Sequence, residues 1–306
     1  MSILTWLNAL PGAAAQGIIW GIMAIGVYIT YKILDIADLT VDGSICTGGA
    51  VCAVLVANGV NVWPAMLVAL VAGVLCGLVT GFFHTFLGIP AILAGILTQL
   101  MLWSVNLKIM GQANQALPSR KYDLLLSSLP SRIPASLLVL AGFLVVLIAL
   151  LYGFFGSELG ASLRATGSNK SMSRAQGINV NFNQVLGLAL SNGIVALAGA
   201  LLAQYQGFAD INMGRGAIVI GLAAVIIGDA VMPRAIKKFF PMKMLTVVIG
   251  GVIYFFVYQT VVFLGLDTDL LKMLSAIVVA IFLSVPYLKG KYSSSHVKNK
   301  EEKKDA

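Results

Sequence analysis

The sequence predicts an all-α protein, a polytopic transmembrane helical bundle of about 8–10 membrane segments. Hydrophobic residues occupy 59% of the 306 positions and charged residues only 10%, whereas a soluble domain carries about 25% charged residues. The mean hydropathy is +0.94, and the apolar residues fall in long runs. Because about 20 consecutive apolar residues span a bilayer as one helix, we expect residues 1–288 to form a single membrane domain in contact with lipid.

Nine apolar segments follow one another along the chain. Their ranges are 13–34, 45–60, 63–86, 88–109, 135–156, 183–206, 217–229, 243–266 and 271–288. The segments 45–60 and 217–229 are short for a full crossing, so they are candidates for broken or re-entrant helices. Residues 1–10 are a candidate for a short interfacial helix ahead of the first crossing.

Basic residues indicate the orientation, because cytoplasmic loops of membrane proteins are rich in Lys and Arg. The basic stretches are 156–183, 230–243 and the tail 289–306, which holds six lysines. We therefore expect a multi-pass protein of the plasma (inner) membrane with a cytoplasmic C-terminus. The net charge of +8 is assigned to this topology and not to nucleic-acid binding. The loop 110–134 is expected outside, and the side of the N-terminus depends on whether a short segment re-enters.

A weak internal repeat links the two halves of the chain at an offset of 172 residues. The matching pairs are Gly21 and Gly193, Ala24 and Ala196, Ala37 and Ala209, Asp38 and Asp210, and Gly49 and Gly221. Each half has a long apolar segment, then a polar break, then a short segment that contains glycine. Paired interrupted helices of this kind point to a transporter's solute pathway, although small residues in membrane helices also match by chance.

The two polar breaks supply the candidate pathway residues. In the first break these are Asp38, Thr40, Asp42, Gly43 and Ser44, and in the second they are Gln204, Gln206, Asp210, Asn212 and Arg215. Ionisable groups at membrane depth are costly and usually functional, and the free N–H groups of a helix start can bind an anion. The alternatives are a headgroup-level loop with ordinary helix caps for the first break and a surface turn with an Asp210–Arg215 ion pair for the second.

The stretch 158–179 is a candidate docking element for a cytoplasmic partner. Leu159 and Leu163 are four residues apart and are expected on one helix face, Gly167 is expected to end that helix, and Met172, Ala175 and Ile178 would form a second apolar stripe. The candidate coupling residues are Gly160, Leu163, Arg164, Ala165, Thr166, Gly167, Asn169, Arg174, Ala175 and Gly177. The alternative is a solvated loop that carries charges.

Several functional signatures are missing from the sequence. There is no G-x-x-x-x-G-K-[ST] phosphate-binding loop, the two histidines are His84 and His296, and glutamate occurs only at 158, 301 and 302. The three cysteines lie in apolar segments without metal-ligand or redox spacing. The sequence thus predicts a chain that is not an enzyme and has no catalytic residues, metal site or cofactor of its own.

Four strings of this sequence resemble the branched-chain amino acid and sugar permease superfamily of ABC importers, nearest to the permeases of tryptophan/tyrosine-type uptake systems. They are the residues 36–44, 89–98, 163–169 and 196–210. The Arg-Ala-Thr-Gly-x-Asn string at 164–169 is the most specific of them. The similarity extends over about residues 13–288.

The resemblance implies a permease subunit that moves a small solute, an amino acid and among these an aromatic one, into the cell. It implies a second permease subunit in a homodimer, two cytoplasmic ATPase subunits that bind the ATP, and an extracytoplasmic solute-binding lipoprotein. It also implies that 158–179 contains the helix that couples to the ATPase. From the residues alone, an ion-coupled secondary transporter is the second hypothesis, and a membrane enzyme or scaffold ranks last because no catalytic constellation is present.

Overall fold

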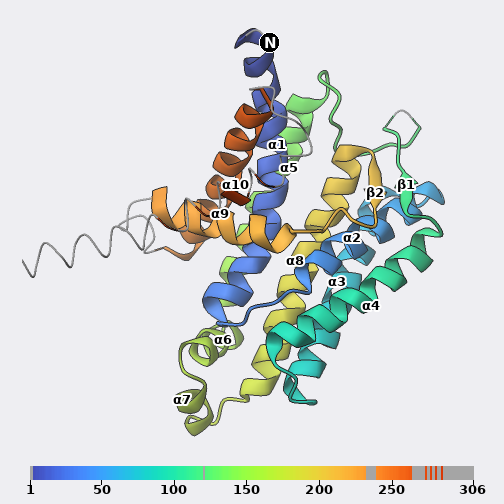
Figure 1. Ribbon diagram of the computed structural model, residues 1–306. Helices are drawn as coiled ribbons and strands as arrows, with labels where there is room; N and C mark the ends of the chain where they lie inside the picture. Colours follow the sequence, from blue (N-terminus) through green and yellow to red (C-terminus); the bar gives the residue numbers. More distant parts are fainter. Residues whose placement is uncertain are drawn as a thin grey trace, which may run out of the picture.

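The computed structural model describes residues 3–119, 121–231 and 239–263, together with residues 273, 276, 277, 280 and 284. Most of this part is helical (Figure 1), which confirms the all-α prediction. The helices are α1 (Ile3–Tyr28), the π-helical turn η1 (Ile29–Ile33), α2 (Val41–Ala57), α3 (Val62–Thr85), α4 (Ala91–Met110), α5 (Ile133–Gly156), α6 (Glu158–Ser168), α7 (Lys170–Ala175), α8 (Val180–Gln206), α9 (Ala217–Val231) and α10 (Phe240–Phe263). Two short antiparallel strands, β1 (Asn114–Ala116) and β2 (Phe208–Asp210), pair with each other.

Within the described ranges, six helices are long and apolar enough to cross a membrane. They are α1 with η1, α3, α4, α5, α8 and α10. The helices α2 and α9 are apolar but shorter, as expected for the two short segments. Together these eight apolar helices agree with the predicted number of segments. The ninth predicted segment, 271–288, lies largely outside the described residues.

The first helix is longer than the sequence predicts. Residues 3–10 continue directly into the apolar run as part of α1, with Pro11 inside the helix, so the separate interfacial helix is wrong. Proline removes one backbone hydrogen bond, but neighbouring helices and local adjustments make it tolerable in membrane helices.

The long helices pair crosswise between the two halves of the chain. Helix α1 packs along α10, and α8 packs along α3. If the sequence halves are aligned at their offset of 172 residues, α1, α2 and α3 correspond to α8, α9 and α10. The first helix of each half therefore packs on the third helix of the other half. Figure 1 shows α1 and α8 running in opposite directions, so the observed arrangement is that of an inverted repeat.

Glycines spaced four residues apart make these crosswise contacts close. A Cβ added to Gly17 or Gly21 of α1 would meet the backbone of Val252 or Val248 on α10, at 2.6 and 2.9 Å from their Cα atoms. On α3, Gly73, Gly77 and Gly81 approach α8 in the same manner. Small residues let helix backbones approach in a bilayer, where packing and not the hydrophobic effect holds helices together.

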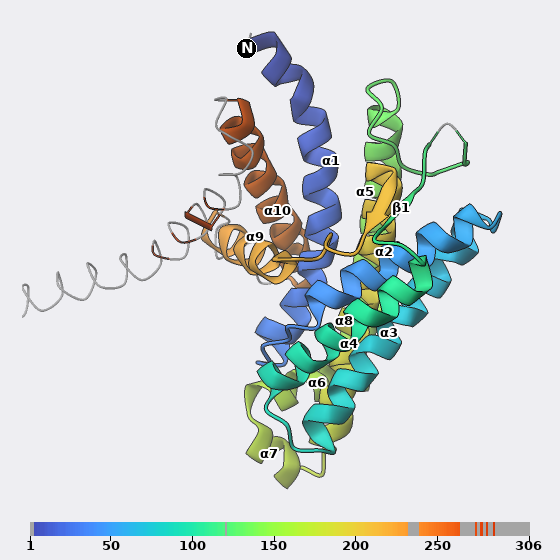
Figure 2. The same ribbon diagram turned by 45° about the vertical axis from the view of Figure 1, so that its right-hand side comes forward.

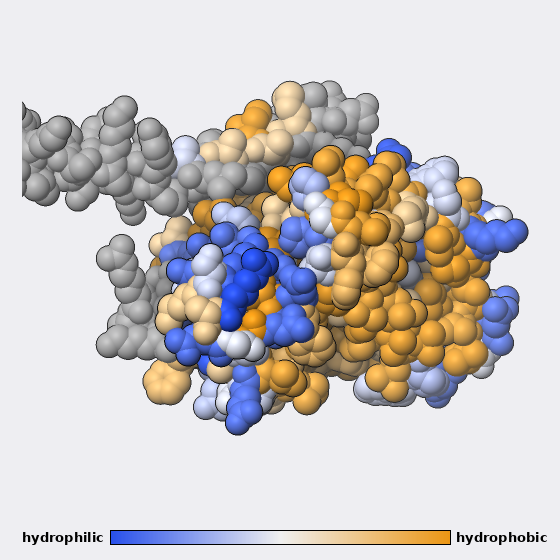
Figure 3. Space-filling view, turned by 90° about the horizontal axis from the view of Figure 1, so that it is seen from below, coloured by the Kyte–Doolittle hydropathy of each residue, from blue (hydrophilic) through white to orange (hydrophobic). Residues whose placement is uncertain are grey.

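The molecule has two polar ends. Figures 1 and 2 show α6, α7 and the turn between α3 and α4 at one end, here called the α7 end. The start of α1, the two strands and the loop segment 121–132 lie at the opposite end. Viewed from the α7 end, hydrophilic residues gather over the α6–α7 region beside a broad hydrophobic surface (Figure 3). Helices α1 and α8 stand in the centre, with α9 and α10 on one side and α2 to α4 on the other (Figures 1 and 2).

Candidate functional site

The two short helices meet at a single carboxylate. Asp42, in the first turn of α2, accepts hydrogen bonds from the backbone N–H groups of Gly216 and Ile218 at 2.9 Å each. The first N–H groups of a helix have no partner within it, and a carboxylate there also interacts favourably with the helix dipole. Asp42 therefore joins the two halves of the chain by capping α9. This α2–α9 junction lies near mid-height of the bundle, where α9 runs crosswise to α1 (Figure 1).

The polar breaks before α2 and α9 contain the same local turn. The Asp38 carboxylate accepts from the Thr40 N–H at 2.9 Å, and the Asp210 carboxylate accepts from the Asn212 N–H at 2.7 Å. Aspartate commonly makes such a bond to the backbone two residues ahead. Because these turns stand at matching positions of the two halves, they support the internal repeat.

Much of the first break belongs to a buried hydrogen-bond network. Asn192 on α8 donates to Asp38 at 2.7 Å and accepts from the Ser44 hydroxyl at 2.6 Å. The hydroxyls of Thr40 and Thr80 lie 2.7 Å apart. All five side chains are buried. Buried polar groups need partners of this kind, so these residues tie α2, α3 and α8 together.

Gln204, near the end of α8, is also buried and hydrogen-bonded. It is fully buried, and its side-chain oxygen accepts from the Leu125 backbone N–H at 3.3 Å. Asp38, Thr40, Ser44 and Gln204 are therefore interior residues, although the sequence placed them with the pathway candidates.

The remaining candidates of the two breaks adjoin cavities. A cavity of about 610 Å³ is lined by Gln206, Asn212 and Arg215 together with residues of α1, α9 and α10. A smaller one of about 130 Å³ is lined by Asp42, Gly43 and Arg215 with residues of α4. Arg215 thus borders both cavities. Asp210 lines neither of them, and within the described ranges it forms no ion pair with Arg215. The alternative of a surface turn held by that pair is therefore not observed.

One face of the α6–α7 element, residues 158–175, packs against the bundle. Gly160 lies against the backbone of Phe155, and Leu163 and Thr166 are buried. The Asn183 amide of α8 donates to the Thr166 hydroxyl at 2.9 Å. Gly167 contacts the carbonyl of Ile33 in η1 and lies inside α6, which ends at Ser168. The helix therefore ends within one residue of the predicted position.

The other face of the α6–α7 element is exposed. Arg164, Asn169, Arg174, Ala175 and Gly177 are exposed, and Ala165 is half-buried. Asn169 also caps α7, because its side chain accepts from the Met172 N–H at 2.9 Å.

Two apolar side chains accompany the charges on this face, Leu159 at 49% and Met172 at 62% exposure. Leu163 is fully buried, so Leu159 and Leu163, which were predicted to share one helix face, differ in their exposure.

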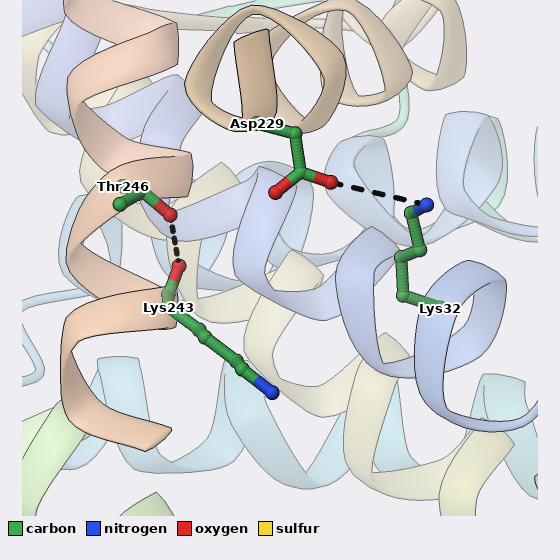
Figure 4. A network of polar contacts seen from close by, with 4 residues as sticks. All are labelled: Lys32, Asp229, Lys243 and Thr246. Carbon is green, nitrogen blue, oxygen red and sulfur yellow. Dashed lines mark hydrogen bonds and ion pairs between the residues drawn. The ribbon is translucent and has the colours of Figure 1, made fainter. Parts of the chain in front are cut away.

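An ion pair connects η1 with α9 on the side of the α7 end. Lys32 Nζ lies 3.8 Å from Asp229 Oδ2, and both side chains are partly exposed (Figure 4). In the same region of α10, the Thr246 hydroxyl donates to the Lys243 carbonyl at 2.7 Å. This pair is not predicted from the sequence. The available signal was one charge near the end of each apolar segment, 13–34 and 217–229.

Comparison with known proteins identifies the type of molecule. The sequence profile described as "Branched-chain amino acid transport system / permease component" matches residues 10–283. The chain is 39% identical over 279 residues to the tyrosine transport system permease protein of Clostridioides difficile, and the aligned region covers 91% of each chain. It is 36% identical to an uncharacterized protein of Rickettsia prowazekii over 91% of this chain and 98% of the relative.

More distant similarity reaches permeases for other solutes. The autoinducer 2 import system permease of Salmonella paratyphi B is 28% identical over 200 residues, which are 61% of this chain and 55% of that protein. No solved structure matches the chain significantly. The profile covers most of the sequence, and the fold is the multi-pass helical bundle that such a subunit requires. The chain therefore belongs to the branched-chain amino acid transport system permease family, the membrane-spanning subunits of ABC transport systems.

Proposed function

We propose that this chain is the permease subunit of an importer that moves an amino acid into the cell with ATP hydrolysed by a separate subunit. The observation that carries the proposal is the α6–α7 element, which packs one face on the bundle and exposes charged and apolar side chains on the other. Such a surface suits a soluble partner. The relative named as a tyrosine transport system permease supports an amino acid as the solute.

In the proposed orientation the protein spans the plasma (inner) membrane with residues 1–288 as its permease domain. The α7 end and the basic tail 289–306 face the cytoplasm, in agreement with their lysines and arginines. The end that carries the N-terminus (Figure 1) then faces outward, toward a solute-binding lipoprotein. Two copies of the chain and two ATPase subunits complete the transporter. Membrane lipids surround it, and nucleic acid has no role.

The proposed solute pathway follows the two cavities beside the α2–α9 junction. Asp42, Gly43, Gln206, Asn212 and Arg215 border it. Asp38, Thr40, Ser44 and Gln204 hold its walls, and Asp210 shapes the turn before α9. Two helix starts at mid-membrane with one carboxylate between them form the type of broken-helix site that transporters use for polar solutes.

The α6–α7 element has a direct structural route to that junction. Gly167 touches η1 at Ile33, and the neighbouring Lys32 pairs with Asp229 near the end of α9. A displacement of α6 by the ATPase would therefore act on η1 and α9 together. We infer that nucleotide binding in the partner reaches the pathway by this route, while the chain itself binds no ATP and uses no cofactor.

A charge on the exposed face of α7 tests the proposal. Met172→Glu places a carboxylate at a side chain that is 62% exposed, so folding should be unaffected. We expect loss of ATPase co-purification and at least a tenfold fall in amino acid uptake by cells, because a few apolar contacts dominate such interfaces. Ser128→Glu, exposed in the loop at the opposite end, is the matched control and should bind the ATPase normally.

The outcome separates two classes of transporter. Full ATPase binding and full uptake by Met172→Glu would contradict docking at this face. Uptake by cells that lack the ATPase gene would instead favour an ion-coupled secondary transporter. The buried Asp38 and the inverted repeat are the observations that agree with this second hypothesis.

A further inference from the structure

The larger cavity has one aromatic wall. Trp20 of α1 and Phe255 of α10 line it, with ring centroids 6.0 Å apart and planes inclined by 30°. Tyr258 extends this wall, since its ring lies 6.0 Å from that of Phe255. Trp20 and Phe255 are only 9% and 7% exposed. Rings held in stacked contact at fixed positions offer a flat surface to another aromatic group.

The remaining wall is polar and carries one positive charge, that of Arg215. It consists of Gln206 at the end of α8 and of Asn212 and Arg215 before α9. Within the described residues Arg215 has no ion-pair partner. The nearby carboxylate of Asp42 is already bonded to the N–H groups of Gly216 and Ile218. The start of α9 is therefore already capped by Asp42, and the Arg215 guanidinium is the positively charged group that the cavity offers to a carboxylate.

These walls together define a ligand class. The cavity volume of about 610 Å³ is in the range of small-molecule sites. We propose that this cavity binds an aromatic amino acid during passage, with its carboxylate on Arg215 and its ring against Trp20 and Phe255. The site rests on the proposed function and extends it, because the permease would then select its solute in addition to the binding protein.

The test compares ligands that lack one of the two groups. The full chain in lipid nanodiscs is titrated with L-tyrosine, with tyramine, which lacks the carboxylate, and with L-leucine, which lacks the ring. We expect tyramine to bind about 10–100-fold more weakly than tyrosine, as for a lost hydrogen-bonded charge. The Arg215→Gln variant should bind tyrosine and tyramine with equal affinity. The Phe255→Leu variant should lose the preference for tyrosine over leucine.

Matched variants separate the site from general damage. Arg132→Gln and Phe82→Leu replace an exposed arginine and an exposed phenylalanine that do not line the cavity, so both preferences should remain. Equal binding of tyrosine and tyramine by the natural chain would overturn the proposal without any variant. An unchanged tyrosine preference in Arg215→Gln would overturn it as well.

Uptake by cells that carry the whole system tests the proposed function independently. Tyrosine uptake without carboxylate selectivity in the nanodisc titration overturns this site and leaves the importer in place. Selective binding in nanodiscs without uptake of any amino acid by cells supports the site and overturns the importer.

Discussion

At the scale of single residues, similar side chains have different roles because their surroundings differ. Asp38 is buried and bonded to Asn192 and Thr40, whereas Asp42 is partly exposed and caps a helix from the other half of the chain. Asp35, seven positions earlier, is exposed and has a φ of 54°. Of these three carboxylates, Asp42 is the one that both borders a cavity and links the two short helices.

Removal of the Asp42 carboxylate should weaken the α2–α9 junction. Asp42→Ala leaves the N–H groups of Gly216 and Ile218 without their acceptor, which should cost about 1–3 kcal/mol. We expect a lower midpoint of thermal denaturation in detergent and reduced uptake, with normal insertion into the membrane. Asp35→Asn is the control, because asparagine tolerates a positive φ and the site is exposed. Equal stability and uptake of Asp42→Ala and the natural chain would show that the cap is dispensable.

At the scale of helices, close backbone contact decides which elements pair. Gly73, Gly77 and Gly81 lie on the α3 face that touches α8, while Gly142 and Gly153 of α5 have open space around them. The membrane-length helices of this protein are apolar on all sides, so an amphipathic pattern cannot define their contact faces. Glycine spacing can define them, because it allows an approach that larger residues prevent.

The α3–α8 contact yields a matched pair of substitutions. A Cβ at Gly77 would stand 2.7 Å from the Ala189 Cα, whereas one at Gly142 meets nothing within 4 Å. Gly77→Val should therefore destabilise the protein by roughly 1–3 kcal/mol or more through overpacking, and Gly142→Val should have little effect. Size-exclusion profiles after heating in detergent measure the difference. Similar profiles for the two variants would contradict the contact.

At the scale of the whole molecule, the polar surfaces are separated into two ends by apolar helices. The α6–α7 element forms one end, and the loop segment 121–132 with the two strands forms the other (Figures 1 and 2). If the protein spans a membrane in the proposed orientation, these ends face different compartments.

Cysteine labelling checks that separation. The three natural cysteines are buried, so a new exposed cysteine should dominate the signal. We expect Ser128→Cys to react with a membrane-impermeant maleimide in intact cells and Ser168→Cys to react only after the membrane is permeabilised. Labelling of both positions from outside would refute the topology.

The sequence predicts most residues of the candidate site, but not which of them are buried and which line a cavity. Both polar breaks were recognised because charges and glycines interrupt apolar runs, and the α6–α7 element was recognised by its basic residues. The sequence does not predict that Asp38 and Gln204 are buried in the interior while Arg215 lines the cavities. The burial of a residue depends on which helices cover it. Cavity walls formed by α1 and α10 together, such as Trp20 beside Phe255, leave no mark in either segment alone.

The membrane class, the family, the order of long and short helices and the weak repeat can all be predicted from the amino-acid sequence, because hydropathy and motifs are properties of neighbouring residues. The crosswise pairing of α1 with α10 and α3 with α8, the capping of α9 by Asp42 and the two-walled cavity become visible in the folded protein alone. These features join segments more than 100 residues apart. Such contacts depend on backbone approach and on the direction of each side chain, which helices of uniform apolar composition do not encode locally.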